Sequence, residues 1–165
     1  MLARLSVVLA LGLAACGGST PARPSGGDAS PPGDIPDNQA FVTYAPPGAR
    51  FSVKVPEGWS QTSTGRDARF TDKLNTIELT WDSPVPAAPA GAKVTTVTRK
   101  AGSARRATYL MPGRPDPVTG KTRTDAVERY EFTHGGRRVV VTLSGPKGAD
   151  NVDPWRIVTD SVRWR

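Results

Sequence analysis

The chain has 165 residues, 37% of them hydrophobic, and carries a formal net charge of +7. Two of its 22 basic residues and three of its 15 acidic residues precede residue 41, so residues 41–165 carry a net charge of +8. The basic residues are scattered, and no recognisable nucleic-acid-binding module accompanies them, which argues against a nucleic-acid-binding protein. The charge instead predicts a solvated basic surface near anionic lipid head groups.

The first sixteen residues have the pattern of a leader that ends in a cysteine. Arg4 gives the start a positive charge, residues 5–13 are mostly apolar, and Cys16 is the only cysteine. About nine apolar residues are too few for a helix that spans ~30 Å of hydrocarbon, which needs ~20. They fit the ~7–15 apolar residues of a signal peptide. The alternative is a core helix with a stray cysteine, but the Gly17-Gly18 pair and a proline-rich stretch follow directly.

The run Leu13-Ala14-Ala15-Cys16 resembles the lipobox of bacterial lipoproteins. The resemblance implies that residues 1–15 are a signal peptide that is removed, and that the thiol of Cys16 carries a diacylglycerol. Each buried acyl methylene contributes ~0.8 kcal/mol to membrane attachment, and two chains anchor a protein stably. We therefore expect a protein held on the outer face of the bacterial cell membrane. With its one thiol acylated, the mature chain would have no disulfide.

Residues 16–40 are predicted to be the lipidated cysteine and a disordered tether. Residues 17–40 hold five prolines and five glycines, and Ile35 is their only large apolar residue. Such a segment buries too little apolar surface to offset the entropy of ordering it. As a coil, these 24 residues span ~27 Å on average. Residues 41–165 then form a single globular domain.

Apolar and polar residues alternate over four segments of this domain, which predicts half-buried strands. The segments are 51–55, 77–81, 126–132 and 139–143. Gly135-Gly136 between the last two predicts a hairpin. Weaker strand patterns cover 41–44, 69–71, 94–98 and 107–111, whereas the Pro- and Gly-rich stretches 84–91 and 112–120 are predicted loops.

The C-terminal segment changes to a helical period. Asp153-Pro154 predicts a helix start, with Asp153 as the N-cap and Pro154 at the first helical position. Trp155, Val158 and Val162 are spaced by three and four residues and so share one face. About two turns of helix must pack on a sheet to be stable. The expected fold class is α+β, a mostly antiparallel sheet with a few short flanking helices.

Motifs for nucleotide or metal binding are incomplete. Gly120-Lys121-Thr122 matches the end of a P-loop, but Pro115 stands where the motif needs glycine, and a strand rather than a helix follows. His134, the only histidine, lies at the expected hairpin turn without other soft ligands. The stretch 148–153 admits a carboxylate site for a hard cation, but turn and helix-capping chemistry is the favoured interpretation.

The chain has no Gly-x-Ser-x-Gly motif, and none of its serines has a recognisable catalytic context. Glu128 alternates onto the same face as Tyr130, where a buried carboxylate needs a partner such as Arg156 or Arg105. We favour a structural ion pair over a catalytic acid. Core packing is likewise favoured over a ligand pocket for the four tryptophans, Trp59, Trp81, Trp155 and Trp164.

Four segments point to a family: Phe51-Ser-Val-Lys-Val-Pro-Glu-Gly-Trp59, Thr71-Asp-Lys-Leu-Asn75, 143–155 (LSGPKGADNVDPW) and Ser161-Val-Arg-Trp164. Together they resemble uncharacterised actinobacterial lipoproteins. The order of strand, Pro-x-Gly-Trp, hairpin and late helix is also similar to the PsbP-like fold, which includes LpqN-type mycobacterial lipoproteins. The resemblance covers nearly all of 41–165. It implies an antiparallel sheet flanked by helices and no established enzyme activity.

We therefore expect an extracytoplasmic, lipid-anchored protein that acts as a non-enzymatic binding or accessory domain without a cofactor. Its partners would be the membrane, through the lipid on Cys16, and an envelope protein or an amphiphilic ligand. The alternative is a cell-envelope hydrolase. An enzyme should show a pocket in which His, Glu or Asp converge. A binding module should show an apolar groove or patch without that convergence.

Overall fold

The computed structural model describes residues 31–116 and 118–165. Cys16, the expected signal peptide at 1–15 and tether residues 17–30 lie outside the described residues. The described elements are β1 (Phe41–Tyr44), β2 (Phe51–Pro56), β3 (Ser60–Thr64), β4 (Asp67–Asp72), β5 (Asn75–Trp81), β6 (Lys93–Arg99), β7 (Gly102–Pro115), β8 (Thr122–His134), β9 (Arg137–Pro146), α1 (Val152–Asp160) and β10 (Arg163–Trp164).

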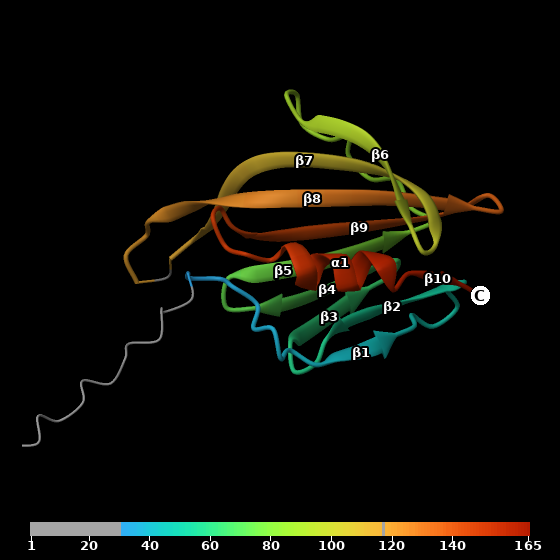
Figure 1. The fold of residues 1–165 in the computed structure, drawn as a ribbon, viewed down its shortest axis with the longest axis horizontal. Helices are drawn as coiled ribbons and strands as arrows, with labels where there is room; N and C mark the ends of the chain where they lie inside the picture. The colour runs from blue at the N-terminus through green and yellow to red at the C-terminus, as the bar shows by residue number, and fades with distance from the viewer. Residues whose placement is uncertain (1–30, 117) are drawn as a thin grey trace, which may run out of the picture.

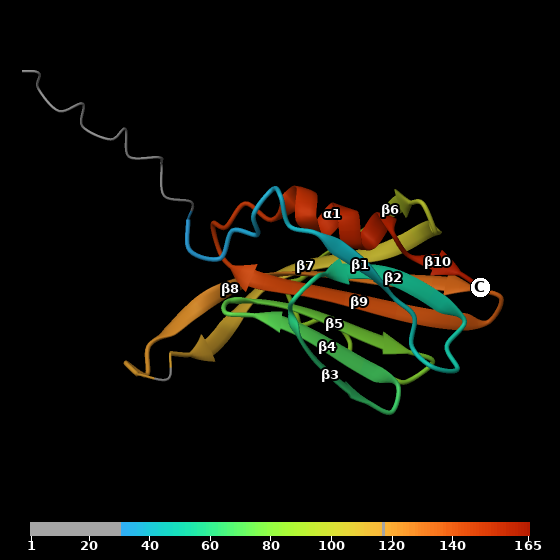
Figure 2. The same cartoon turned by 90° about the horizontal axis from the view of Figure 1, so that it is seen from below.

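Seven of the strands form one antiparallel sheet in the order β3-β4-β5-β9-β8-β7-β6 (Figure 1). A smaller sheet, β1-β2-β10, lies with α1 against one face of it (Figure 2). The expected α+β class with several short helices is therefore wrong. Within the described residues the fold is nearly all-β, with α1 as its one α-helix. Between residues 41 and 146 the apolar residues alternate with period two, which favours strands. Only the segment near residue 155 has a helical period, so only this segment forms a helix.

The core lies between the seven-stranded sheet and the layer formed by α1 and the small sheet. Leu79 and Leu143 from the large sheet are fully buried there, as are Phe51 of β2 and Val158 of α1. In β5 the burial alternates strictly along Asn75–Trp81, so every second side chain enters the core. Burial of each large aliphatic or aromatic side chain contributes ~1.5–3 kcal/mol, which makes this interface the main source of stability.

The predicted strands at 51–55, 77–81, 126–132 and 139–143 are confirmed, as are the four weaker ones. Gly135 and Gly136 form the tight turn between β8 and β9, both with positive φ (53° and 74°). The loop predicted at 84–91 is confirmed. The loop predicted at 112–120 is wrong in part, because β7 continues to Pro115 and pairs there with Thr122.

The helix begins earlier than predicted. Its N-cap is Asn151, and Asp153 lies in the first turn without capping it. Pro154 is buried inside that turn, where a missing N–H is tolerated because the first N–H groups have no partner within the helix. Trp155 and Val158 are buried as predicted, and Val162 is buried just beyond the helix end. This short helix is held by its packing on the sheet.

The domain also begins earlier than residue 41. Ile35 is only 4% exposed, and its N–H donates to Asn151 Oδ1 at 2.8 Å. The carbonyl of Gly33 accepts from Asn75 Nδ2 (2.8 Å) and Asn151 Nδ2 (3.0 Å). We call these four residues, Gly33, Ile35, Asn75 and Asn151, the asparagine clamp. Disorder up to residue 40 was predicted from local composition. Composition does not reveal the partners of Ile35, which lie far along the sequence.

Strands β7 and β8 extend past the rest of the sheet. β7 pairs with β6 only as far as Thr108, and β8 pairs with β9 only from Asp125 onward. Residues 112–116 and 118–124 therefore stand out as a two-stranded ribbon, at the end of the molecule where the described chain begins (Figures 1 and 2). Within the described residues no helix combines the length and apolar character that a membrane span needs.

Candidate functional site

The face of the seven-stranded sheet that is turned away from α1, which we call the open face, carries polar side chains in ordered rows. The strand register forms a row across four strands. Arg69 of β4 pairs with Glu78 of β5, Glu78 pairs with Thr142 of β9, and Thr142 pairs with Arg129 of β8. Neighbouring strands are ~4.8 Å apart, so this row crosses ~15 Å of the sheet. Strand pairing, and not local sequence, brings these four polar side chains together.

A second row runs parallel to the first. It consists of Thr71, Thr76, Ser144, Val127 and Tyr109, each the partner of the next. Thr142, Thr76 and Ser144 near the middle have short side chains, whereas longer side chains, those of Arg69, Glu78, Arg129 and Tyr109, stand around them. Short residues between long ones leave a hollow over the sheet, which we call the trough.

The trough has a volume of about 350 Å³ and is lined by residues of β4, β5, β9, β8 and β7. A second hollow of about 310 Å³ continues it over β3, β4 and β5. Arg69 and Glu78 line both hollows. The open face thus offers one extended polar surface that a pair of charged side chains divides into two parts.

Each carboxylate that lines the middle of the trough has an arginine partner. Arg69 pairs with Glu78, and both side chains are about 40% exposed, at 44% and 40%. Arg123 Nε donates to Asp125 Oδ1 at 2.8 Å, and Arg123 Nη2 donates to the carbonyl of Leu74 at 2.9 Å. These pairs satisfy the charges, and the exposed Arg69–Glu78 pair contributes little to stability. They leave guanidinium edges and hydroxyl groups available for hydrogen bonds to a ligand.

Tyr109 forms part of the wall of the trough on the β7 side. Burial raises the pKa of its phenol; Arg129 opposes that shift, and Glu78 adds to it. The hydroxyl group therefore stays neutral at physiological pH and can both donate and accept a hydrogen bond. A neutral phenol beside threonine and serine hydroxyls is suited to binding polar groups.

Beyond the trough, the loop between β5 and β6 lies over part of the open face. The carbonyl of Pro86 in this loop accepts a hydrogen bond from Arg129, whose side chain is only 8% exposed. Arg129 also donates to Glu131 Oε1 at 2.9 Å. Val127 and Val140 on this face are also buried, although they do not belong to the main core.

Glu128 is on the opposite, covered face, and its partner is neither Arg156 nor Arg105. It pairs with Arg106 and accepts a hydrogen bond from the hydroxyl of Tyr130 at 2.6 Å. Arg156 instead pairs with Asp160 (3.6 Å) and Arg105 with Glu131 (3.2 Å). The prediction of a structural ion pair is confirmed, and the named partners were wrong. Register decides the pairing, since Arg106 lies opposite Tyr130 on the neighbouring strand.

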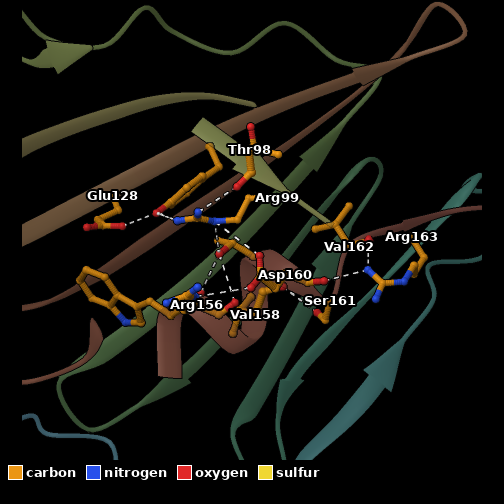
Figure 3. Close-up of polar contacts among 12 residues, drawn as sticks. Thr98, Arg99, Glu128, Arg156, Val158, Asp160, Ser161, Val162 and Arg163 are labelled. Atoms are coloured by element: carbon orange, nitrogen blue, oxygen red, sulfur yellow. Dashed lines mark hydrogen bonds and ion pairs between the residues drawn. The ribbon is translucent and has the colours of Figure 1, made fainter. Parts of the chain in front are cut away.

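A network of polar contacts connects Glu128 to the helix (Figure 3). Arg99 donates to the hydroxyl oxygens of Tyr130 (3.1 Å) and Thr159 (3.2 Å), and it lies 3.7 Å from Asp160. Burial raises the pKa of Tyr130, and the hydrogen bond and charge of Glu128 raise it further. The network ties β6, β8 and α1 together, so its function is structural.

His134 and Glu128 do not form a catalytic pair. They lie six residues apart on β8, a separation of ~20 Å along a strand. His134 is exposed at the β8–β9 turn, where its ring stacks on Trp164 with centroids 5.6 Å apart. The structure therefore keeps the only histidine away from Glu128 and from the trough residue Ser144, whose partner on β8 is Val127.

The other candidate sites have structural explanations. Gly120-Lys121-Thr122 joins two strands of the ribbon, whereas a P-loop joins a strand to a helix. In the stretch 148–153 the side chain of Asn151 is used by the asparagine clamp. No group of three or more potential metal-ligating His, Cys, Asp or Glu side chains occurs in the described part of the chain. The tryptophans pack in or against the core, as predicted.

The trough was missed in the sequence because its residues are ordinary strand residues. The strand predictions depend on the apolar members of each alternating segment, which form the core. The polar members, such as Thr76, Glu78, Thr142 and Ser144, were the available signal. Their shared face became visible only when strand order placed β5 beside β9.

The fold and the trough define a nearly all-β domain with a polar, open sheet face. No family model matches the chain, and no curated protein matches it. Among solved structures it is similar to a protein of Bacteroides thetaiotaomicron VPI-5482, with a TM-score of 0.53, 15% identity and coverage of 74% of this chain and 48% of that chain. The chain thus spans about half the length of that protein, and the likeness shows a shared fold alone.

A second solved structure, the Saccharomyces cerevisiae Ran-binding protein Mog1p, matches with a TM-score of 0.48 and 9% identity. The match covers 76% of this chain and 96% of Mog1p. The similarity is too low to carry a functional argument.

Proposed function

We propose that this protein is a membrane-anchored extracytoplasmic lipoprotein whose domain binds a partner non-enzymatically through the trough on its open face. The observation that carries the proposal is the trough itself. Its floor is made of hydroxyl side chains, including Thr142 and Ser144, and the acidic groups Glu78 and Asp125 are paired with arginines. Such a surface supplies many hydrogen-bonding groups without an activated nucleophile and its base.

The anchor is proposed on the sequence Leu13-Ala14-Ala15-Cys16 and its resemblance to a lipobox. The asparagine clamp supports it indirectly. It fixes residues 33–35 on the surface of the domain, so that a preceding tether would leave from one defined point. The resemblance to actinobacterial lipoproteins and to the PsbP-like fold belongs to the same proposal.

The ligand class follows from the chemistry of the trough. It is polar and open, and it differs from the apolar groove that the sequence led us to expect for a binding module. An extended, polar segment of an envelope protein fits a row of hydroxyl groups between two ion pairs, because its backbone amides both donate and accept hydrogen bonds. The polar head of an amphiphile presents similar groups and is the second ligand type.

Two measurements test the proposal. Metabolic labelling with a radioactive fatty acid should mark the wild-type protein and fail to mark Cys16→Ser, which should accumulate as an uncleaved precursor. Label that persists in Cys16→Ser would overturn the proposal that a lipid on Cys16 anchors the protein.

The second measurement tests the trough. Immobilised protein should retain a component of a detergent-solubilised envelope extract, and Thr142→Arg with Ser144→Arg should abolish retention by filling the trough. Thr133→Arg, an exposed threonine at the far end of β8, is the matched control and should leave retention unchanged. Equal retention by the wild type, the double variant and Thr133→Arg would overturn the proposal that the trough is the binding site. Turnover of ester, peptide or glycoside substrates that Ser144→Ala abolishes would replace binding by the hydrolase alternative.

A further inference from the structure

The ribbon and its base expose three apolar side chains, of which Met111 also lines the trough, whereas Leu110 and Val118 do not. Val118 is 91% exposed, and Leu110 and Met111 at the base of the ribbon are 54% and 45% exposed. These are three of the seven large hydrophobic side chains that are exposed among the described residues. Their grouping on one projecting element marks a surface for interaction.

The apolar side chains lie on both sides of the ribbon. Leu110 and Met111 are neighbours on β7, so they point to opposite faces of the strand. A folded partner that docks on one face covers only one of them. A medium that surrounds the element, as lipid does, covers both.

The backbone of the ribbon is poorly suited to pairing with another strand. Pro112 and Pro115 lack N–H groups, and the register shifts between them. Prolines and bulges on an edge strand prevent edge-to-edge association. A second copy of the chain added through β7 is therefore disfavoured at this point.

The charge of the ribbon complements an anionic surface. Arg114 and Lys121 are exposed, and neither forms an ion pair within the described part of the chain. Asp116, the one acidic residue of 112–124, accepts the N–H groups of Val118 (3.0 Å) and Thr119 (2.7 Å) and so stabilises the turn. Each basic side chain near an anionic bilayer contributes ~1 kcal/mol.

The start of the described chain is next to the base of the ribbon. Gly33 is in close contact with Pro146, where a Cβ on the glycine would meet Pro146 Cδ at 2.5 Å. Pro146 in turn lies opposite Asp125 at the base of the ribbon, and Lys147 donates to the carbonyl of Thr124 at 2.9 Å. Both therefore lie at the same end of the molecule (Figures 1 and 2). The 14 residues between Cys16 and residue 31 reach at most ~50 Å.

From these observations we infer that the ribbon tip is a second membrane contact, which inserts Val118 at the bilayer interface and places Arg114 and Lys121 on anionic phospholipid head groups. The inference rests on the proposed lipid anchor, which brings this end of the domain to the membrane. The two contacts together fix the orientation of the domain. The lipid alone would leave the domain free to rotate, so that β6 and the trough would have no defined orientation relative to the membrane.

The experiment uses the full-length lipidated protein in vesicles that contain phosphatidylglycerol. Acylation blocks Cys16, so Thr119→Cys at the ribbon tip gives one free thiol for an environment-sensitive dye. Thr133→Cys, at the opposite end of β8, is the matched control. Lipids with a quencher on the acyl chain should quench the dye at 119 and leave the dye at 133 unquenched. Val118→Asp combined with Arg114→Glu and Lys121→Glu should abolish the quenching at 119 while the protein still sediments with the vesicles.

Equal quenching at 119 and 133, or none at 119, would overturn the inference. So would shielding of the dye at 119 that appears without lipid and grows with protein concentration, since a second copy would then cover the ribbon. Failure of the anchor is recognised separately, because the unsubstituted protein would then take up dye at Cys16. In that case the dye on Thr119→Cys carried in a Cys16→Ser background is measured against saturating vesicles, and absence of quenching there again overturns the inference.

Discussion

The two faces of the seven-stranded sheet are built by the same strands but differ in burial and polarity. On the covered face, Ile77 and Leu79 of β5 are 1% and 0% exposed beneath α1 and the small sheet. On the open face, the intervening Thr76 and Glu78 line the trough and stay half-exposed. One strand thus contributes to stability with its odd-numbered residues and to the proposed binding surface with its even-numbered ones. Substitutions on the two faces should therefore separate stability from binding.

The largest effect is expected on the covered face, at Trp155. Trp155→Ala should lower the free energy of unfolding by about 3–5 kcal/mol, because it empties a buried site that a large aromatic side chain fills. Denaturant unfolding followed by circular dichroism measures the change. An unchanged unfolding midpoint would mean that α1 is not part of the cooperative core.

The asparagine clamp, at the border of the covered face, should come next. Asn151→Ala removes the partner of the Ile35 N–H and one of the donors to the Gly33 carbonyl. Since each buried unsatisfied group costs ~1–3 kcal/mol, we expect a loss of about 2–3 kcal/mol in the free energy of unfolding.

Hydrogen exchange provides a local measurement of the clamp. Asn151→Ala should release the amide of Ile35 to fast exchange. Asn38→Ala, an exposed asparagine in the same segment, is the control and should change neither quantity. Slow exchange of Ile35 in Asn151→Ala would show that residues 31–40 are held by other contacts.

Tyr109 on the open face and Tyr130 on the covered face allow the two faces to be compared by the pH dependence of stability. Burial raises the pKa of both phenols above the ordinary value of 10. The neutral form is therefore favoured in the folded state, and its contribution to stability is fully present below pH ~10 and is lost as the pH rises through the folded pKa.

Tyr130→Phe should lower the free energy of unfolding by about 1 kcal/mol at neutral pH, since the hydrogen bonds with Glu128 and Arg99 are lost. It should also weaken the fall in stability above pH 10. Unfolding curves at pH 7 and above pH 10 measure both changes. If the alkaline fall is as steep in Tyr130→Phe as in the wild type, the phenol on the covered face is not its cause.

The smallest change in stability is expected on the open face. Thr142→Val should alter the free energy of unfolding by no more than about 0.5 kcal/mol, because it exchanges an incompletely buried side chain for one of similar shape. Binding of the envelope component should nevertheless weaken, since the floor of the trough loses a hydroxyl group. A loss of stability as large as that of Trp155→Ala would contradict the distinction between the two faces.

Local periodicity and residues adjacent in the chain were enough to predict eight of the ten described strands, the tight turn at Gly135-Gly136 and the helical face of Trp155 and Val158. Strands β3 and β10 were not predicted, because Ser60–Thr64 has no apolar alternation and Arg163–Trp164 is only two residues long. The sequence also contains the run Leu13-Ala14-Ala15-Cys16, and the proposed anchor depends on the resemblance of this run to a lipobox.

Which elements are neighbours follows from the tertiary structure alone. It paired β5 with β9, which created the trough, and it gave Glu128 the partner Arg106. It docked Ile35 against Asn151 across 116 positions of the chain and left the ribbon at 112–124 without flanking strands. Such contacts depend on strand order and register, which periodicity does not encode, because the same alternating pattern is compatible with many pairings. The burial of Ile35 and the exposure of Val118 follow from that order.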